Sequence, residues 1–165
     1  MSTVYAESSA VLRWLLGASH ADRIERALAT APVVVTSELT AAEVGRSLQR
    51  LVATGRLDAE AGERAWASYA AASQHWRVYG VAEPVLHRVR QPFPREPVRT
   101  LDAIHLATAI LYALEVGPPV VLSVDEQVRA NAAALGLAIA PAAATVGAPA
   151  GGRAGTARSR PRSRG

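Results

Sequence analysis

Four acidic side chains are placed along the sequence where they could bind a divalent metal ion together. Glu7 follows an apolar N-terminal run, and Asp125 closes a second apolar run nearer the C-terminus. Glu43 lies within a helical stretch, and Asp102 opens another. Several carboxylates are tolerated close together only when a cation balances them, and their oxygens are the ligands that Mg²⁺ prefers. The four acids therefore predict a metal site, provided that the fold brings them together.

Each of these acids also has a simpler structural explanation. Asp102 and Asp125 begin helices, and an aspartate there commonly caps free backbone N–H groups. Glu43 and Arg46 are three residues apart on one helix, a spacing that allows a weak surface ion pair. The joint occurrence favours a functional site, because acids follow the first and fourth expected strands, where open parallel sheets bind their ligands.

Polar residues near the acids are supporting candidates. Ser8 and Ser123 carry hydroxyls beside two of the acids, where they could orient a carboxylate or a water molecule. Arg46 could balance the acidic cluster or contact a phosphate. His105 lies one turn after Asp102 between apolar neighbours, and a histidine in that setting is more often packed and hydrogen-bonded than a metal ligand.

Strands and helices alternate along the chain, and the acids fall at their boundaries. Short apolar runs predict strands at 2–6, 33–36, 77–82, 119–124 and 137–140. Apolar residues at helical spacing predict helices at 9–17, 20–30, 38–54, 59–74, 83–90, 102–115 and 126–135. This alternation predicts an α/β, three-layer fold in which helices flank a central parallel sheet.

The composition of the 165-residue chain indicates one domain with an apolar core, since 50% of its residues are hydrophobic. The absence of cysteine excludes a disulfide framework and a thiolate metal site. No apolar run reaches the roughly 18 residues of a membrane span, so we expect a cytoplasmic protein without membrane contact. No glycine-rich phosphate loop follows the first strand, which argues against P-loop or dinucleotide binding.

The basic charge of the chain is concentrated at its C-terminus. Residues 147–165 contain five arginines and no acid, which leaves 13 arginines against 14 acids in the rest of the chain. From Pro141 onward, small residues, proline and arginine predominate without apolar periodicity, so this stretch has little surface to bury. We therefore expect a folded domain at 1–141 and a disordered Ala/Gly/Arg-rich basic tail at 142–165.

Four motifs follow one another over residues 3–140. They are Val4–Leu12 around Glu7, Glu43 with Arg46, Leu101–Ala109, and Ser123–Asp125. In this order and at these intervals they resemble the motifs of PIN-domain ribonucleases, and within that family those of VapC-like toxins from type II toxin–antitoxin systems. The third motif, with the sequence LDAIHLATA, is the most specific single match.

The resemblance implies a PIN-like nuclease domain that acts as a Mg²⁺- or Mn²⁺-dependent endoribonuclease. Glu7, Asp102 and Asp125 would be metal ligands, and Glu43 would be the fourth catalytic acid. The products would carry a 5′-phosphate and a 3′-hydroxyl. The implied partners are the RNA substrate, a cognate antitoxin protein and a second copy of the chain in a homodimer.

Glu7 departs from the family pattern, which usually has aspartate at this place. Glutamate keeps the charge but adds one methylene, and Mg²⁺ demands near-octahedral ligand geometry. The departure keeps a second hypothesis open, a catalytically impaired PIN-like module that binds RNA or a partner protein. A metal-dependent phosphatase on a related α/β fold is a weaker third hypothesis, because no Asp-x-Asp follows the first strand.

Apolar residues also predict a docking surface for the antitoxin. The first expected helix carries three consecutive large apolar residues, Trp14–Leu16, which is more than one core-facing stripe needs. Together with Leu48, Leu51 and Val52, they are expected to form a groove for an antitoxin helix or strand.

Overall fold

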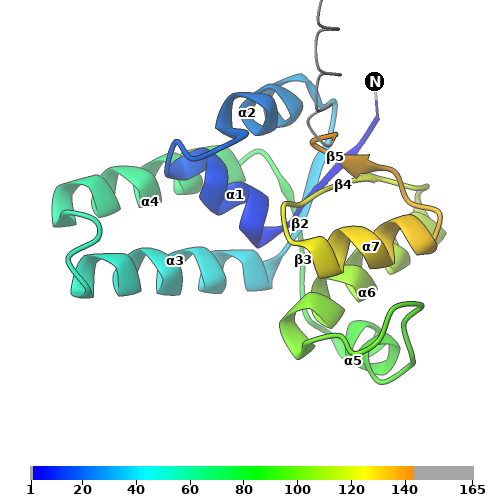
Figure 1. Ribbon diagram of the computed structural model, residues 1–165. Coiled ribbons are helices and arrows are strands. Elements are labelled where there is room, and N and C mark those ends of the chain that lie inside the picture. Colours follow the sequence, from blue (N-terminus) through cyan, green and yellow to red (C-terminus); the bar gives the residue numbers. More distant parts are fainter. Residues whose placement is uncertain (1, 143–165) are drawn as a thin grey trace, which may run out of the picture.

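The computed structural model of the protein describes residues 2–142 (Figure 1). The predicted tail at 142–165 lies outside this part except for its first residue, so the boundary between domain and tail stays a prediction. Within the described part, no helix combines the length and the apolar character that crossing a membrane requires.

Five parallel strands form the central sheet in the order β3–β2–β1–β4–β5. They are β1 (Val4–Ala6), β2 (Val34–Ser37), β3 (Arg77–Tyr79), β4 (Val120–Leu122) and β5 (Ile139–Ala140). β1 lies in the centre, and its Val4 is opposite both Val34 and Val120. Every segment predicted as a strand overlaps one, and the predicted parallel sheet is confirmed.

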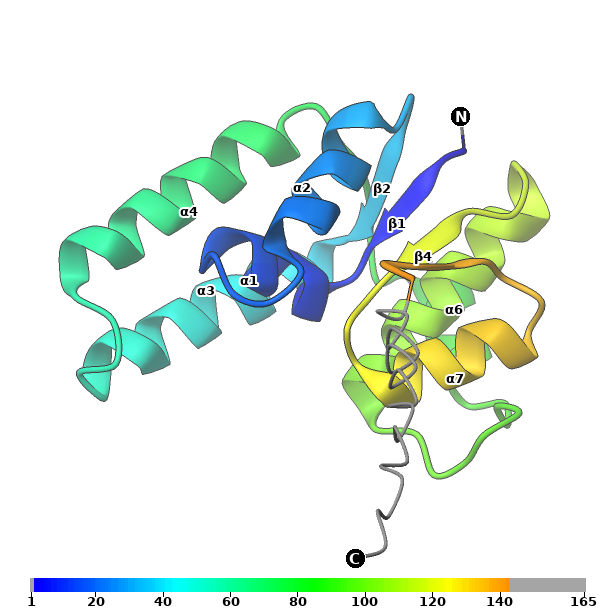
Figure 2. The same cartoon turned by 45° about the horizontal axis from the view of Figure 1, so that its top comes forward.

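Helices cover both faces of the sheet in the described part of the chain. They are α1 (Ser8–Leu15), α2 (Ala21–Thr30), α3 (Glu38–Ala53), α4 (Ala59–Ser73), α5 (Glu83–Val89), α6 (Thr100–Glu115) and α7 (Glu126–Ala134). Helices α1 to α4 lie on one side of the sheet, and α5 to α7 lie on the other (Figures 1 and 2). The predicted three-layer α/β fold is therefore confirmed.

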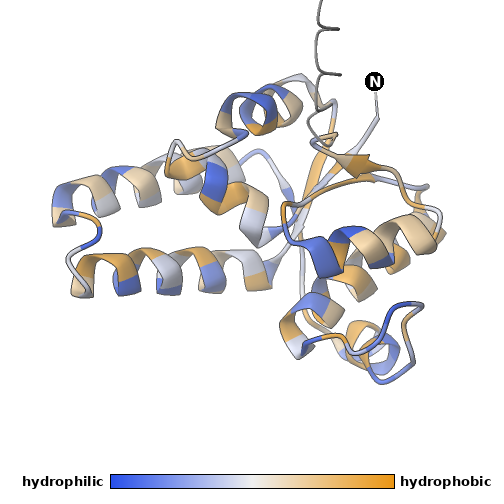
Figure 3. Ribbon diagram, in the orientation of Figure 1, coloured by the Kyte–Doolittle hydropathy of each residue, from blue (hydrophilic) through white to orange (hydrophobic). Residues whose placement is uncertain are grey.

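Alternating side chains of the strands supply the cores on the two faces. In β1, Val4 and Ala6 pack with residues of α1 to α4, whereas Tyr5 packs with residues of α6 and α7. This is the period of two that a strand imposes on its side chains. β4 and most of β1 are apolar, whereas α3 and α4 alternate between apolar and polar residues (Figure 3). A sheet that is covered on both faces requires such apolar strands.

Helix α6 is buried on nearly every side. All its residues from Asp102 to Ala109 are buried. Leu106 and Tyr112 join the cluster formed with the sheet, while Ile104 belongs to a smaller cluster formed with α5. Polar residues on such a helix are held rigidly, because the surrounding side chains are close-packed.

Trp14 does not line a docking groove as predicted. It packs against Trp76 with ring centroids 6.5 Å apart, and it borders two core clusters. Of the other residues predicted for the groove, Leu48 and Val52 do line one, which lies between α3 and α4.

Candidate active site

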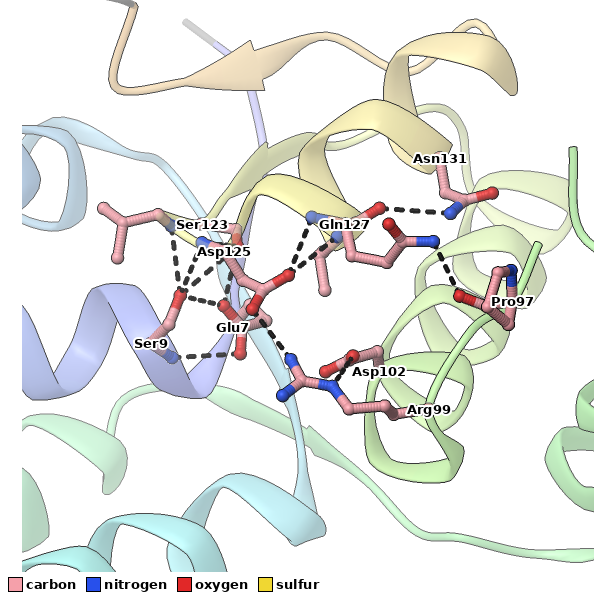
Figure 4. Close-up of polar contacts among 11 residues, drawn as sticks. Glu7, Ser9, Pro97, Arg99, Asp102, Ser123, Asp125, Gln127 and Asn131 are labelled. Atoms are coloured by element: carbon pink, nitrogen blue, oxygen red, sulfur yellow. Dashed lines mark hydrogen bonds and ion pairs between the residues drawn. The ribbon is translucent and has the colours of Figure 1, made fainter. Parts of the chain in front are cut away.

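The carboxyl ends of β1, β2 and β4 lie at one edge of the sheet, and the predicted acids follow them. Glu7 comes directly after β1, Glu43 lies on the helix after β2, and Asp125 follows β4. Asp102 lies in the first turn of α6, and Arg99 joins it to Asp125 (Figure 4). Glu7 is 4% exposed and Asp102 is 8% exposed. Carboxylates buried to this extent need hydrogen-bond or ionic partners.

Glu7 is held by serine hydroxyls and by the start of α1. Its Oε1 accepts a hydrogen bond from the backbone N–H of Ser9 at 2.9 Å, so Glu7 itself caps the helix. Its Oε2 accepts hydrogen bonds from the Ser9 hydroxyl and, at 2.7 Å, from the Ser123 hydroxyl. The longer side chain thus folds back onto its own helix.

The two carboxylate oxygens of Asp125 have different partners. Oδ1 accepts hydrogen bonds from the backbone N–H groups of Gln127 and Val128 at 2.9 and 3.0 Å, which confirms the capping explanation for this residue. Oδ2 instead accepts a hydrogen bond from Nη2 of Arg99 at 2.9 Å. Oδ2 therefore takes no part in capping the helix and is the oxygen that binds a cation.

Asp102 does not cap its helix. The N-cap of α6 is Arg99, and no side chain caps the backbone there. Oδ2 of Asp102 accepts a hydrogen bond from Nε of Arg99 at 2.8 Å, so one guanidinium group joins Asp102 to Asp125 (Figure 4). The simple structural explanation of Asp102 is therefore wrong, and a buried carboxylate remains whose partner is a cation.

Glu43 belongs to a second hydrogen-bonded group on the same edge. Its Oε2 accepts hydrogen bonds from the Ser8 hydroxyl and, at 2.7 Å, from Nε2 of His105. Nδ1 of His105 lies 3.0 Å from the hydroxyl of Tyr5, and Nε2 also lies 2.8 Å from the Ser8 hydroxyl. If Tyr5 donates to Nδ1, the proton of the neutral ring is on Nε2, where it points to Glu43.

The pKa directions agree with this assignment. Burial raises the pKa of Tyr5 well above its ordinary value, so the phenol stays protonated and can donate. Burial would also raise the pKa of Glu43, but the hydrogen bonds from His105 and Ser8 outweigh it, and the pKa of Glu43 is lowered. Glu43 is therefore ionised at neutral pH.

The donor set fits a hard divalent cation in kind, because carboxylate oxygens are the ligands that such an ion prefers. Four carboxylates lie at the edge, and two of them already share a cation, Arg99. As placed, each carboxylate is turned to a protein partner, and among residues 2–142 no three acidic or histidine side chains converge closely enough to hold an ion. Buried side-chain polar atoms in this part all have partners.

The three predicted supporting residues differ in whether they contact the acids. Ser8 and Ser123 donate to Glu43 and Glu7, as their position beside the acids predicted. Arg46, in contrast, is exposed, and it makes no salt bridge with any residue that the structure describes.

Two important residues escaped sequence reasoning. Arg99 precedes Asp102 by three residues, which is the spacing that drew attention to Glu43 and Arg46, and this signal could have found it. The Ser9 hydroxyl accepts hydrogen bonds from the backbone N–H groups of Val124 and Asp125 at 3.0 and 3.2 Å, and it thereby joins α1 to the end of β4. No local sequence signal predicts that link.

Comparison with known proteins agrees with the geometry. The family model for the PIN domain matches residues 4–134. The chain belongs to the PIN-domain family. Among proteins of this family, it is 35% identical over 139 residues to ribonuclease VapC46 of Mycobacterium tuberculosis, a match that covers 84% of this chain and 97% of VapC46.

A solved PIN-domain structure supports the fold. The crystal structure of VapC20 from Mycobacterium tuberculosis, a toxin that cleaves the sarcin–ricin loop, matches with a TM-score of 0.53 at 19% identity. The match covers 77% of this chain and 93% of VapC20. The resemblance to VapC-like PIN domains is thus confirmed, while the roles of the individual site residues remain predictions.

Proposed function

We propose that this PIN-domain chain is a Mg²⁺- or Mn²⁺-dependent endoribonuclease and the toxin of a toxin–antitoxin pair. Membership of the PIN-domain family and the likeness to ribonuclease VapC46 support this function. The observation that carries it is Asp102, a buried carboxylate that caps nothing and has a cation as its partner. The alternative of a catalytically impaired module gains no support from these relatives.

A bound divalent ion would supply the chemistry of water activation and of charge neutralisation at the leaving oxygen. Glu7, Asp102 and Asp125 would hold it. The serine hydroxyls on Glu7 orient that carboxylate, and the capping contacts of Asp125 orient its second oxygen toward the site.

Glu43 is the candidate for holding a proton. It is ionised at neutral pH, and His105 and Ser8 fix the orientation of its carboxylate. A carboxylate in this state can accept a hydrogen bond or a proton from an attacking water. We therefore assign Glu43 a role through water and the other three acids a role as ligands.

Replacing Asp102 by asparagine tests this function. Asp102→Asn removes the charge while nearly keeping the shape, so cleavage of an RNA oligonucleotide should fall by at least about 100-fold, the upper range for residues that only support ligands. Asp22→Asn, on the exposed start of α2, is the matched control and should cleave like the wild type. A folded Asp102→Asn variant that cleaves at the wild-type rate would refute the function.

The groove between α3 and α4 is the docking site that we propose for the antitoxin. This groove has a volume of about 470 Å³. It is lined by Gly45, Leu48, Gln49, Val52, Ala59, Gly62, Glu63 and Trp66. Trp66 is 42% exposed, and an exposed tryptophan beside an apolar groove is typical of a protein-binding site. The predicted homodimer and the predicted cytoplasmic location remain predictions.

A further inference from the structure

A guanidinium group stands between two of the four acids. Nε of Arg99 lies 2.8 Å from Oδ2 of Asp102, and Nη2 lies 2.9 Å from Oδ2 of Asp125 (Figure 4). The side chain of Asp102 is 12% exposed and that of Asp125 is 26% exposed, whereas the side chain of Arg99 is 73% exposed. The cation therefore reaches the buried acids from the solvent side.

The loop before α6 holds the backbone of Arg99 in place. Gln127 on α7 donates from Nε2 to the carbonyl oxygens of Arg95 and Pro97, at 2.7 and 2.8 Å. The buried Asn131 accepts from the backbone N–H of Arg95 at 2.9 Å and donates to its carbonyl oxygen. The start of the Arg99 side chain is thus anchored, while its charged end lies in solvent.

Arg99 and a metal ion would compete at this edge, because two cations held by the same pair of carboxylates repel each other. Oδ1 of Asp125 is occupied in capping α7, so Oδ2 is the oxygen on which the two cations compete. The guanidinium group is largely solvated, and a divalent ion would neutralise the buried Asp102 in its place, so Arg99 can leave without stranding an unpaired carboxylate. A guanidinium released at this edge has the planar fork that binds phosphate oxygens in pairs.

We propose that Arg99 is a resident counter-cation of the acidic site, which a divalent ion displaces from Asp102 and Asp125 and which then binds the RNA backbone. This inference rests on the proposed function and adds the regulation of its metal affinity. The charges of Asp102 and Asp125 raise the pKa of Arg99, as expected for a cation held by both.

Mn²⁺ titration by calorimetry, without RNA, tests the displacement. The Arg99→Gln variant should bind Mn²⁺ about two- to fivefold more tightly than the wild type, because a largely solvated guanidinium group is a weak competitor. The Mn²⁺ affinity of Arg99→Lys should lie between those of the wild type and Arg99→Gln, since an ammonium group cannot bridge both carboxylates as a planar guanidinium does. Arg90→Gln removes an ion pair with Glu83 in which both side chains are exposed, away from the acids, and it should leave the affinity unchanged.

Thermal unfolding separates displacement from a purely structural role. Without metal, Arg99→Gln should melt at a lower temperature than the wild type, and saturating Mn²⁺ should remove the difference. A deficit that persists with Mn²⁺ would assign Arg99 to structure alone and overturn the proposal. Unchanged or weaker Mn²⁺ binding by Arg99→Gln would overturn it as well.

Kinetics test the second role of Arg99. At saturating Mn²⁺, Arg99→Gln should raise KM for RNA several-fold while kcat changes less, because the lost contact is to the backbone of the substrate. An unchanged KM would overturn this part. If the wild type binds no Mn²⁺, both the proposed function and this inference are wrong. Wild-type binding that is lost in Asp102→Asn but unaltered in Arg99→Gln would remove the inference alone.

Discussion

Glu7 shows how a longer acid can be accommodated at a site where the family usually has aspartate. Its carboxylate accepts three hydrogen bonds from Ser9 and Ser123, and it is almost completely buried. The side chain folds back over the start of α1 to make these contacts. They favour a site built around glutamate over one that is merely stretched by it.

The change Glu7→Asp tests that conclusion. Shortening the side chain withdraws the carboxylate from Ser9 and Ser123, so we expect RNA cleavage with Mg²⁺ to fall about tenfold or more, the effect typical of lost ligand orientation. The rate constant for cleavage of a short RNA, measured with saturating Mg²⁺, is the readout. Faster cleavage by Glu7→Asp would show that glutamate strains the site.

Sequence reasoning at the residue scale named the acids and Arg46 as site residues but did not name Arg99. Arg46 and Arg99 both lie three residues from an acid, Arg46 within α3 and Arg99 at the N-cap of α6. Spacing alone cannot tell them apart, because the direction of each side chain depends on how its helix packs. Arg46 points to solvent, whereas Arg99 precedes a helix whose first turn is buried.

At the scale of elements, the helices and strands were predictable, but one boundary changed the chemistry. Helix α6 was expected to begin at Asp102, where an aspartate caps, and it begins at Thr100 instead. This shift of two residues places Asp102 inside the first turn and frees its carboxylate from capping. The start of such a helix depends on the loop before it, and Gln127 and Asn131 of α7 hold this loop in place. No local sequence pattern reveals these distant contacts.

The paired helices α3 and α4 carry a prediction about the antitoxin. Trp66→Glu should weaken binding of the cognate antitoxin at least about tenfold, as expected for an exposed tryptophan at the centre of an interface. Its melting temperature should change little, because Trp66 is 42% exposed.

Trp14→Glu supplies the contrast for this experiment. It should destabilise the domain, because Trp14 packs against Trp76 between α1 and the end of α4. Antitoxin affinity measured by calorimetry and melting followed by circular dichroism distinguish the two variants. Full antitoxin affinity in folded Trp66→Glu would place the antitoxin elsewhere.

For the whole molecule, the parallel topology explains why acids far apart in sequence lie at one edge of the sheet. Strands β1, β2 and β4 are neighbours and run in one direction, so the residues after them share one edge. The alternation of strands and helices predicted this edge. The order of the strands was not predictable, because it is set by packing between segments that are distant in sequence.

The basic C-terminal segment carries a prediction that depends on charge alone. Deleting residues 147–165 removes five arginines and no acid. Affinity for RNA should fall mainly at low ionic strength, because contacts to phosphates weaken steeply as salt rises. The melting temperature should stay unchanged within error. A large drop in melting temperature would show that this segment contributes to folding.

Cleavage of RNA before and after metal removal tests the central claim most directly. The protein is treated with EDTA, dialysed, and assayed on an end-labelled RNA with and without added Mg²⁺ or Mn²⁺. A site of four carboxylates predicts that activity disappears and returns with either ion, and that the products carry a 5′-phosphate and a 3′-hydroxyl. Cleavage that persists in EDTA, or that leaves a 2′,3′-cyclic phosphate, would contradict the account.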